Sequence, residues 1–577
     1  MKDTNSNVLS VKELQTVFVN DGNEFEAVKN VSFDVPRGST IGIVGESGSG
    51  KSVTSLSIMR LIASPPGYIR NGVINYTDQE QRQTDILDIS EAKMCTLRGN
   101  DISMIFQEPM SSLNPTQRCG KQVAEAITVH HSVSKAEAKA RVISLFEKVQ
   151  LPDPERIYRS YPHEMSGGQI QRVMIAMAVA NNPSVLIADE PTTALDVTVQ
   201  KEIIKLLSEI KEEYNTSTIF ISHDLGVIKE IADYVIVMYK GEIVEQGTAE
   251  VLFNNPKHAY TKGLIACRPP MNRRMHRLPT ISDFMERVDD DSAQLNFVDS
   301  LVEPLQDYHT RLDNLKTERE ILRVENLSTY YTAKTNFFGR PTAYTKAVDD
   351  VSFSMKKGET LGLVGESGSG KSTLGKTILR LIPPTSGKVY FEDQDVFNLD
   401  KLAMRNLRRD YQIIFQDPFS SLNPRMRIGA AIQEPMKVHG IHQNDNIRKE
   451  KVIDLLEKVG LEADYYDRYP HQFSGGQRQR ICIARTLSMN PKFIICDESV
   501  SALDVSVQAQ ILNLLKDLKD EYDLSYIFIS HDLSVVKFIS DRIMVMQAGK
   551  IVEMNDAESI LNNPQKKYTQ DLLEAVM

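Results

Sequence analysis

Two eight-residue loops in this sequence have the residues and the spacing needed to hold nucleotide phosphates. In each, glycines let backbone N–H groups turn inward on the phosphates, a lysine reaches the terminal phosphates and a serine hydroxyl suits Mg²⁺. One such match arises by chance in on the order of one chain in fifty of this length. Both loops are followed by the same later motifs, so we expect a tandem ATPase. The residues of the loops are Gly45, Ser47, Gly48, Gly50, Lys51 and Ser52, and Gly365, Ser367, Gly368, Gly370, Lys371 and Ser372.

Each loop is followed, well downstream, by an acidic pair at the end of an apolar run and then by a histidine. The aspartate of the pair suits Mg²⁺ held through water, and the glutamate is placed to orient and polarise the attacking water. The histidine can bridge to the γ-phosphate as charge develops, so the expected chemistry is positioning and electrostatics without a covalent intermediate. These residues are Asp189, Glu190 and His223, and Asp497, Glu498 and His531.

The elements that must position these side chains indicate an α/β fold. Apolar runs of strand type, such as residues 40–44 and 360–364, lead into the phosphate loops, and others lead into the acidic pairs. Runs that are apolar on both faces suit the centre of a parallel sheet. Apolar residues at helical spacing in 138–149 predict a helical subdomain inserted between the loop and the acidic pair.

The spacing of the two copies predicts the domain boundaries. Lys51 and Lys371 are 320 positions apart, whereas Asp189 and Asp497 are 308 apart, so the first copy carries additional residues. Most lie between 64 and 97, where residues 77–83 predict a polar surface loop. We expect a first domain at 1–268, an acidic linker at 269–320 and a second domain at 321–577.

The linker holds 11 acidic and 4 basic residues within 283–320. This charge favours a solvated connection, with some helix near 311–323, over a dedicated binding segment.

Composition excludes several other classes of protein. The 577-residue chain is 41% hydrophobic and 25% charged, which is typical of a soluble globular protein. No apolar run reaches the roughly 18 residues of a membrane span, and the N-terminus does not resemble a signal peptide. We therefore expect a cytosolic chain that associates with a membrane only through partners. The net charge of −10 argues against nucleic acid, and the five cysteines show no metal-binding spacing.

Beyond the phosphate loops, the order of motifs in both halves resembles the ATP-binding cassette (ABC) ATPases. This resemblance implies an antiparallel β region beside the mainly parallel sheet core. It also implies Q-loop glutamines that help to hold Mg²⁺ together with the loop serines and the aspartates, a signature sequence at the start of a helix, and an aromatic platform for the adenine. The implied nucleotide-contacting residues are Phe18, Gln107, Ser166, Gly167, Gly168, Gln169 and Asp196 in the first half, and Tyr331, Gln416, Ser474, Gly475, Gly476, Gln477 and Asp504 in the second.

The signature sequences need a phosphate to contact, because a helix N-terminus favours an anion. In the resembling family two cassettes pack head to tail, which here implies Lys51 opposite Ser474 and Lys371 opposite Ser166. A covalent tether makes this pairing intramolecular at high effective concentration. Both copies carry the full residue set, so both sites are expected to hydrolyse ATP.

Residues around the motifs, such as 106–115 with 415–424 and 161–164 with 469–472, resemble the peptide and nickel importer subgroup. This resemblance implies an ATP-hydrolysing subunit at the cytoplasmic face of the inner membrane, working with two integral-membrane permeases and an extracytoplasmic substrate-binding protein. A di- or oligopeptide is the expected cargo, with nickel chelates, glutathione and peptide antibiotics left open. The alternative is a soluble tandem ABC ATPase acting on ribosomes, which the acidic linker disfavours.

Overall fold

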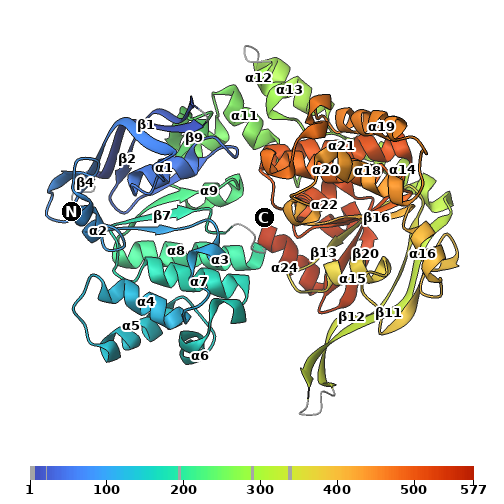
Figure 1. The fold of residues 1–577 in the computed structure, drawn as a ribbon, viewed down its shortest axis with the longest axis horizontal. Helices are drawn as coiled ribbons and strands as arrows, with labels where there is room; N and C mark the ends of the chain where they lie inside the picture. The colour runs from blue at the N-terminus through green and yellow to red at the C-terminus, as the bar shows by residue number, and fades with distance from the viewer. Residues whose placement is uncertain (1–6, 21, 193–196, 287–290, 336–340, 577) are drawn as a thin grey trace. The chain divides into compact units, whose positions relative to one another are not determined.

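A computed structural model describes residues 7–20, 22–192, 197–286, 291–335 and 341–576 (Figure 1). These residues form two compact units. The first comprises residues 7–192, 199–265 and 281–286, and the second comprises 197–198, 266–280 and 291–576, as far as they are described. The predicted boundaries at 268 and 320 stay predictions. Among the described residues, no helix has the combination of length and apolar character that a bilayer crossing requires.

The core of the first unit is a six-stranded sheet whose strands are parallel except at one edge, where β10 runs antiparallel to β9. Every residue of β3, β7 and β8 is buried, as expected for a parallel sheet with both faces covered. The strand order is β10 (Glu242–Thr248), β9 (Tyr234–Tyr239), β3 (Thr40–Val44), β8 (Ser217–Ile221), β7 (Val185–Asp189) and β6 (Ile102–Ile105).

A second, antiparallel sheet packs its apolar face into the same core. It is formed by β2 (Asn23–Pro36), β1 (Asn7–Asn20), β4 (Gly67–Thr77) and β5 (Gln83–Asp85). The helices are α1 (Lys51–Ile58), α2 (Glu91–Leu97), α3 (Pro109–Ser112), α4 (Cys119–Thr128), α5 (Lys135–Lys148), α6 (Pro154–Arg159), η1 (Pro162–Glu164), α7 (Gly167–Ala178), α8 (Val197–Tyr214), α9 (Leu225–Ile231), α10 (Ala249–Asn254), α11 (Ala259–Ala266) and α12 (Ile281–Met285).

The second unit repeats this architecture. Its six-stranded sheet has the order β16 (Tyr411–Ile414), β17 (Phe493–Asp497), β18 (Ser525–Ile529), β13 (Thr360–Val364), β19 (Arg542–Gln547) and β20 (Lys550–Asp556), and its antiparallel sheet β12 (Pro341–Lys356), β11 (Glu320–Thr335), β14 (Ser386–Phe391) and β15 (Gln394–Asp395). The helices are α13 (Asp291–Ser300), α14 (Leu305–Thr317), α15 (Lys371–Ile378), α16 (Lys401–Leu407), α17 (Pro418–Ser421), α18 (Ile428–Val438), α19 (Asp445–Lys458), η2 (Ala463–Asp467), η3 (Pro470–Gln472), α20 (Gly475–Leu487), α21 (Val505–Tyr522), α22 (Leu533–Ile539), α23 (Ala557–Asn562) and α24 (Lys567–Val576).

The fold confirms the predicted α/β class, with a mainly parallel core, an antiparallel β region and an inserted helical subdomain in each unit. In the first unit this subdomain is built from α4, α5 and α6, which contact one another. The helix predicted at 138–149 lies almost entirely within α5, whose buried face includes Ala138, Val142 and Phe146. The spacing of these residues at one helical face explains why the prediction succeeded.

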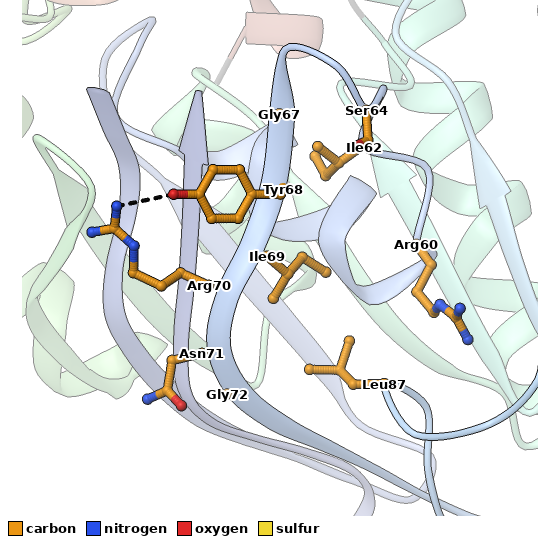
Figure 2. Close-up of a pocket in the computed structure, with 10 residues that line it drawn as sticks. All are labelled: Arg60, Ile62, Ser64, Gly67, Tyr68, Ile69, Arg70, Asn71, Gly72 and Leu87. Atoms are coloured by element: carbon orange, nitrogen blue, oxygen red, sulfur yellow. Dashed lines mark hydrogen bonds between the residues drawn. The ribbon is translucent and has the colours of Figure 1, made fainter. Parts of the chain in front are cut away.

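The additional residues of the first unit lengthen β4, which has 11 residues where β14 has 6. The expected polar loop after residue 77 is the turn into β5, where Asp78 pairs with Arg82. The longer strand borders a hollow of about 460 Å³ (Figure 2). Its two arginines already have partners, because Arg60 donates to the carbonyl oxygens of Ile86 and Ile89 and Arg70 pairs with two glutamates of β2.

The segment between the repeats differs from the expected solvated linker. Residues 271–280 and 301–317, which we call the strap, pack against the second unit. Tyr308 of α14 is completely buried, and Arg274 and Leu278 are 4% and 1% exposed. The helix expected at 311–323 spans Leu305–Thr317 and is followed by strand β11 from Glu320. The prediction of a solvated linker was based on the average acidic composition, which does not reveal the few apolar and cationic residues that make these contacts.

The strap joins the second unit through hydrogen bonds at the start of β19. The hydroxyl of Tyr308 donates to the carbonyl oxygen of Asp541 at 2.9 Å and accepts from the N–H of Ala557 at 3.0 Å. The guanidinium of Arg274 donates to the carbonyl oxygen of Ser540 at 2.7 Å. Leu278 and the side chain of Asn513 exchange two further hydrogen bonds. The strap is therefore bound to the main chain that surrounds the central sheet.

A buried charge network reinforces this contact. Glu303 accepts from Arg274 and Arg311, and Arg311 Nε also donates to Asp541 Oδ1 at 2.9 Å. Asp541 accepts in addition from Lys519 and from the N–H of Thr360, the first residue of β13. Burial alone would raise the pKa of Asp541, but the charges of Lys519 and Arg311 outweigh it and hold the pKa at about 2. Asp541 is therefore ionised at neutral pH and anchors the strand that leads into the phosphate loop.

Candidate nucleotide sites

Each phosphate loop lies between a central strand, β3 or β13, and the helix that follows it, α1 or α15. The ammonium of Lys51 donates to the carbonyl oxygens of Gly45 and Glu46 at 2.7 and 2.8 Å, and Lys371 makes the same two bonds in the second unit. Gly45 has a φ of 151°, and a Cβ there would lie 2.2 Å from the Met238 carbonyl oxygen. Only glycine fits this turn, which explains why both loops carry a glycine at this position.

A tyrosine from a distant helix holds each loop, and sequence reasoning missed it. Tyr260 of α11 accepts a hydrogen bond from the Glu46 N–H at 2.9 Å, and Tyr568 of α24 accepts one from the Glu366 N–H at 3.1 Å. A Tyr-Thr pair occurs at both positions, 260–261 and 568–569. This repeated pair is the sequence signal that could have found the two tyrosines, although it does not reveal their contact with the loops.

The serine that follows each loop lysine meets the aspartate at the end of a central strand. Ser52 Oγ donates to Asp189 Oδ1 at 3.0 Å, and Ser372 Oγ donates to Asp497 Oδ1 at 2.6 Å. Burial is the main cause that raises the pKa of Asp189 to about 6, and it also raises the pKa of Asp497. A buried carboxylate beside a hydroxyl is an all-oxygen donor set, which fits Mg²⁺ that keeps several of its waters.

Glutamine, glutamate and histidine come together next to each serine–aspartate pair. In the first unit, Gln107 Nε2 donates to Glu190 Oε2 at 3.0 Å, and His223 Nδ1 lies 3.1 Å from the same oxygen. Glu190 has a φ of 48°, a left-handed conformation that is rare for a non-glycine residue and often marks functional sites. The structure therefore brings the three predicted side chains together, with Gln107 and His223 at one oxygen of the Glu190 carboxylate.

The second unit has the same cluster with a longer histidine contact. Gln416 Nε2 donates to Glu498 Oε2 at 2.8 Å, and His531 Nδ1 lies 3.9 Å from that oxygen. Glu498 has a φ of 47°. The imidazole of His531 lowers the pKa of Glu498 against the effect of burial. Burial would lower the pKa of His531, but the Glu498 carboxylate raises it overall.

The signature sequences form the N-termini of α7 and α20. Ser166 Oγ accepts from the Gln169 N–H while Gln169 Oε1 accepts from the Ser166 N–H, and Ser474 and Gln477 form the same capping box. The side chains of Gln169 and Gln477 thus stabilise the helix ends, and their contact with a nucleotide stays a prediction.

The two glycines of each signature have different surroundings. A Cβ on Gly168 would lie 3.2 Å from Val199 of α8, and one on Gly476 would lie 2.4 Å from Val507 of α21. A Cβ on Gly167 would meet no atom within 4 Å, and one on Gly475 would meet only Leu503 at 3.8 Å. The second glycine therefore allows helix packing, while the space beside the first glycine is open.

The remaining predicted contacts are less closely tied to the loops. Phe18 on β1 is half-buried and faces Gly67 of β4, and Tyr331 on β11 is 43% exposed. Asp504 is the N-cap residue of α21, whereas Asp196 lies outside the described residues. Stacking of Phe18 and Tyr331 on adenine stays a prediction.

Two family profiles match this chain. The profile described as "ABC transporter" matches residues 28–193 and 348–501. The profile described as "Oligopeptide/dipeptide transporter, C-terminal region" matches residues 244–293 and 552–577. The chain belongs to the ABC transporter family. The two units of this ABC protein are therefore ATPase domains, and a segment of the oligopeptide/dipeptide type follows each ABC transporter match in the sequence.

Curated relatives agree with these matches along the whole chain. The glutathione import ATP-binding proteins GsiA of Salmonella paratyphi A and of Escherichia coli K12 are each 46% identical to it, over 570 and 578 residues. Each alignment covers 99% of this chain and 89% of the relative. A solved dimeric structure of the ATP-binding cassette MJ0796 with ADP and Pi is 28% identical, with a TM-score of 0.37, over 41% of this chain and 98% of its own. The identity to the glutathione import ATP-binding proteins argues against the class that acts on ribosomes.

Proposed function

We propose that this ABC ATPase hydrolyses ATP at two sites, one in each unit, and that the free energy drives import of a small peptide across a membrane. The observation that carries the proposal is the duplicated cluster in which a glutamine and a histidine surround one glutamate beside a serine–aspartate pair. Both copies are complete, which favours two hydrolytic sites over one that only binds ATP.

Within each cluster the side chains have distinct tasks. Glu190 and Glu498 orient and polarise the attacking water. The lowered pKa of Glu498 keeps that carboxylate ionised, so that it can accept a hydrogen bond from the water. Gln107 and Gln416 fix the glutamates by direct hydrogen bonds. His223 and His531 lie 3.1 and 3.9 Å from the same carboxylate oxygens, and in this proposal they bridge to the γ-phosphate as charge develops.

Mg²⁺ completes the proposed sites. Its donors would be Ser52, Gln107 and Asp189 in the first unit and Ser372, Gln416 and Asp497 in the second, and the ion would neutralise phosphate charge when bound. The buried aspartates support this assignment, because a carboxylate whose pKa is raised by burial gains stability from a nearby cation.

Each ATP is proposed to be enclosed by both units of one molecule. A Cβ would find open space at Gly167 and only Leu503 at Gly475, and these glycines begin helices of 12 and 13 residues whose N-termini favour phosphate. In a head-to-tail arrangement the Ser166 signature would cap ATP at Lys371, and the Ser474 signature would cap ATP at Lys51. Phe18 and Tyr331 would stack on adenine, with Asp196 and Asp504 near the phosphates.

The partners follow from the importer class. Two integral-membrane permeases would contact the ATPase at the cytoplasmic face of the inner membrane, and an extracytoplasmic binding protein would deliver the cargo. The family description names oligopeptides and dipeptides and the relatives' names specify glutathione, which is a tripeptide. A peptide of two to a few residues is therefore the proposed cargo.

The test is purification of the tagged chain from its native membranes in mild detergent, followed by mass spectrometry. Two polytopic permeases are expected to co-purify, and the complex in liposomes should hydrolyse ATP faster when its binding protein carries a peptide. Recovery of the chain with ribosomal proteins and without permeases would overturn the importer proposal. The glutamate-to-glutamine variant at position 190 or 498 provides the hydrolysis-deficient control.

A further inference from the structure

The two serine–aspartate pairs differ by one cation. In the second unit, Lys376 Nζ lies 3.8 Å from Asp497 Oδ2, while Ser372 donates to the other oxygen of that carboxylate. Ser372 and Lys376 are four residues apart on α15 and so share one face of the helix. Both oxygens of Asp497 are therefore engaged by the same helix.

The first unit has no lysine at the corresponding position of its helix α1. The equivalent position on α1 is Leu56, a half-buried apolar residue that packs against the core. Asp189 accepts from Ser52 through Oδ1, as Asp497 does from Ser372. Asp189 and Asp497 are buried to a similar extent, at 4% and 2% exposed, so burial would not make them differ in cation binding. The two aspartates differ in the charge beside them, because the first unit has Leu56 where the second has Lys376.

We infer that Lys376 weakens the binding of the divalent cation at the second site, so that the two ATP sites of one molecule differ in their requirement for Mg²⁺. The inference rests on the proposed ATP sites. A fixed positive charge beside a carboxylate competes with a metal ion for that carboxylate's negative charge. Lys376 acts through Asp497 and is a positioning residue, not a catalytic one.

The size of the effect is limited by solvent. The side chain of Lys376 is 38% exposed and that of Asp497 only 3%, so the ammonium approaches the carboxylate from the solvent. Screened interactions of partly exposed charges change an equilibrium by roughly three- to tenfold. We expect the metal dissociation constant at the second site to exceed that at the first by a factor in this range.

The test uses Mn²⁺ as the probe and counts free Mn²⁺ by electron paramagnetic resonance in the presence of saturating AMP-PNP. The full-length chain should bind two Mn²⁺ with separate affinities. Lys51→Ala, which removes nucleotide from the first site, should leave the weaker one. Lys376→Met keeps the length of the side chain, removes its charge and should bring the two affinities together, whereas Lys376→Arg should keep them apart.

A reciprocal variant and two further readings complete the design. Leu56→Lys should weaken Mn²⁺ at the first site, and Leu56→Met is its uncharged control. Two equal affinities in the parent protein, or affinities that Lys376→Met does not move, would overturn the inference. A loss of ATP binding by Lys376→Met in EDTA would also overturn it, because the ammonium would then bind nucleotide directly. Fewer than two bound AMP-PNP per chain would instead refute the proposed pair of sites.

Discussion

Replacement of Arg311 by alanine tests whether the strap is part of the second unit. The guanidinium donates to Glu303 and to Asp541, whose side chains are 5% and 2% exposed. Breaking a buried ion pair typically costs about 3–5 kcal/mol, because the remaining charge is left without its partner. Arg311 is itself 35% exposed and Asp541 keeps Lys519, so solvent screening reduces the expected loss to about 2–3 kcal/mol.

Arg277→Ala is the matched control. Arg277 also lies in the strap and pairs with Asp517 of α21, but the two side chains are 50% and 55% exposed. Exposed pairs of this kind contribute about 0–1 kcal/mol. Both variants remove one arginine from the strap, and they differ in the burial and in the number of the carboxylates that lose a partner.

Hydrogen exchange at equilibrium provides the measurement. Amides of β13 and β19 should exchange faster in Arg311→Ala, with the opening free energy lowered by about 2–3 kcal/mol, while β3 and β9 of the first unit stay unchanged as internal reference. An effect on β13 no larger than that of Arg277→Ala would refute the reasoning. So would an equal loss in β3, since the strap belongs to the second unit.

Further predictions concern pH and catalysis. The folded pKa of Asp541 is about 2 against an ordinary value of 3.8, so its stabilisation is present above about pH 4 and lost as the pH falls toward 2. Acid unfolding of the second unit should therefore begin at higher pH in Arg311→Ala, which circular dichroism would follow. Glu498→Gln should retain ATP at its site and lower turnover roughly 10²–10⁴-fold, as measured with radiolabelled ATP; unchanged turnover would contradict its role. If the sites are coupled, Lys51→Ala and Lys371→Ala should each abolish most ATPase activity, whereas half activity would indicate independent sites. Gly365→Ala places a Cβ 2.1 Å from a backbone carbonyl oxygen and should weaken ATP binding far more than the control Gly247→Ala, which lies outside the loops and meets no atom within 4 Å.

The central sheet and the proximity of Ser52 to Asp189 could be predicted from sequence because local patterns determine them. A loop that follows one buried strand and an aspartate that ends another must meet at the carboxyl edge of a parallel sheet, although 137 positions separate the two residues. The repetition of each motif removed the ambiguity that a single copy would have left. The same reasoning predicted the helix in 138–149, whose apolar residues share one face.

The strap and Lys376 could not be predicted in this way. Arg274 and Arg311 lie in a segment whose average composition is acidic, and their partners Ser540 and Asp541 are more than 200 positions away. Nothing local distinguishes a lysine that will meet a buried aspartate from one that will face water. The capping boxes at Ser166 and Ser474 show the opposite case, where a four-residue pattern carries the geometry.

The strap also determines where this polypeptide can be divided. Residues 301–317 precede the second repeat in sequence, yet Tyr308 is completely buried against it. A gene fragment that begins at residue 321 would encode a half lacking the side chains that cover the start of β19. A fragment that begins near residue 270 would include the strap, whose side chains cover the start of β19. The repeat suggests a boundary at residue 321, whereas independent expression of the second unit requires one about 50 residues earlier. Fragments 1–320 and 321–577 should reassociate through the strap when they are produced together.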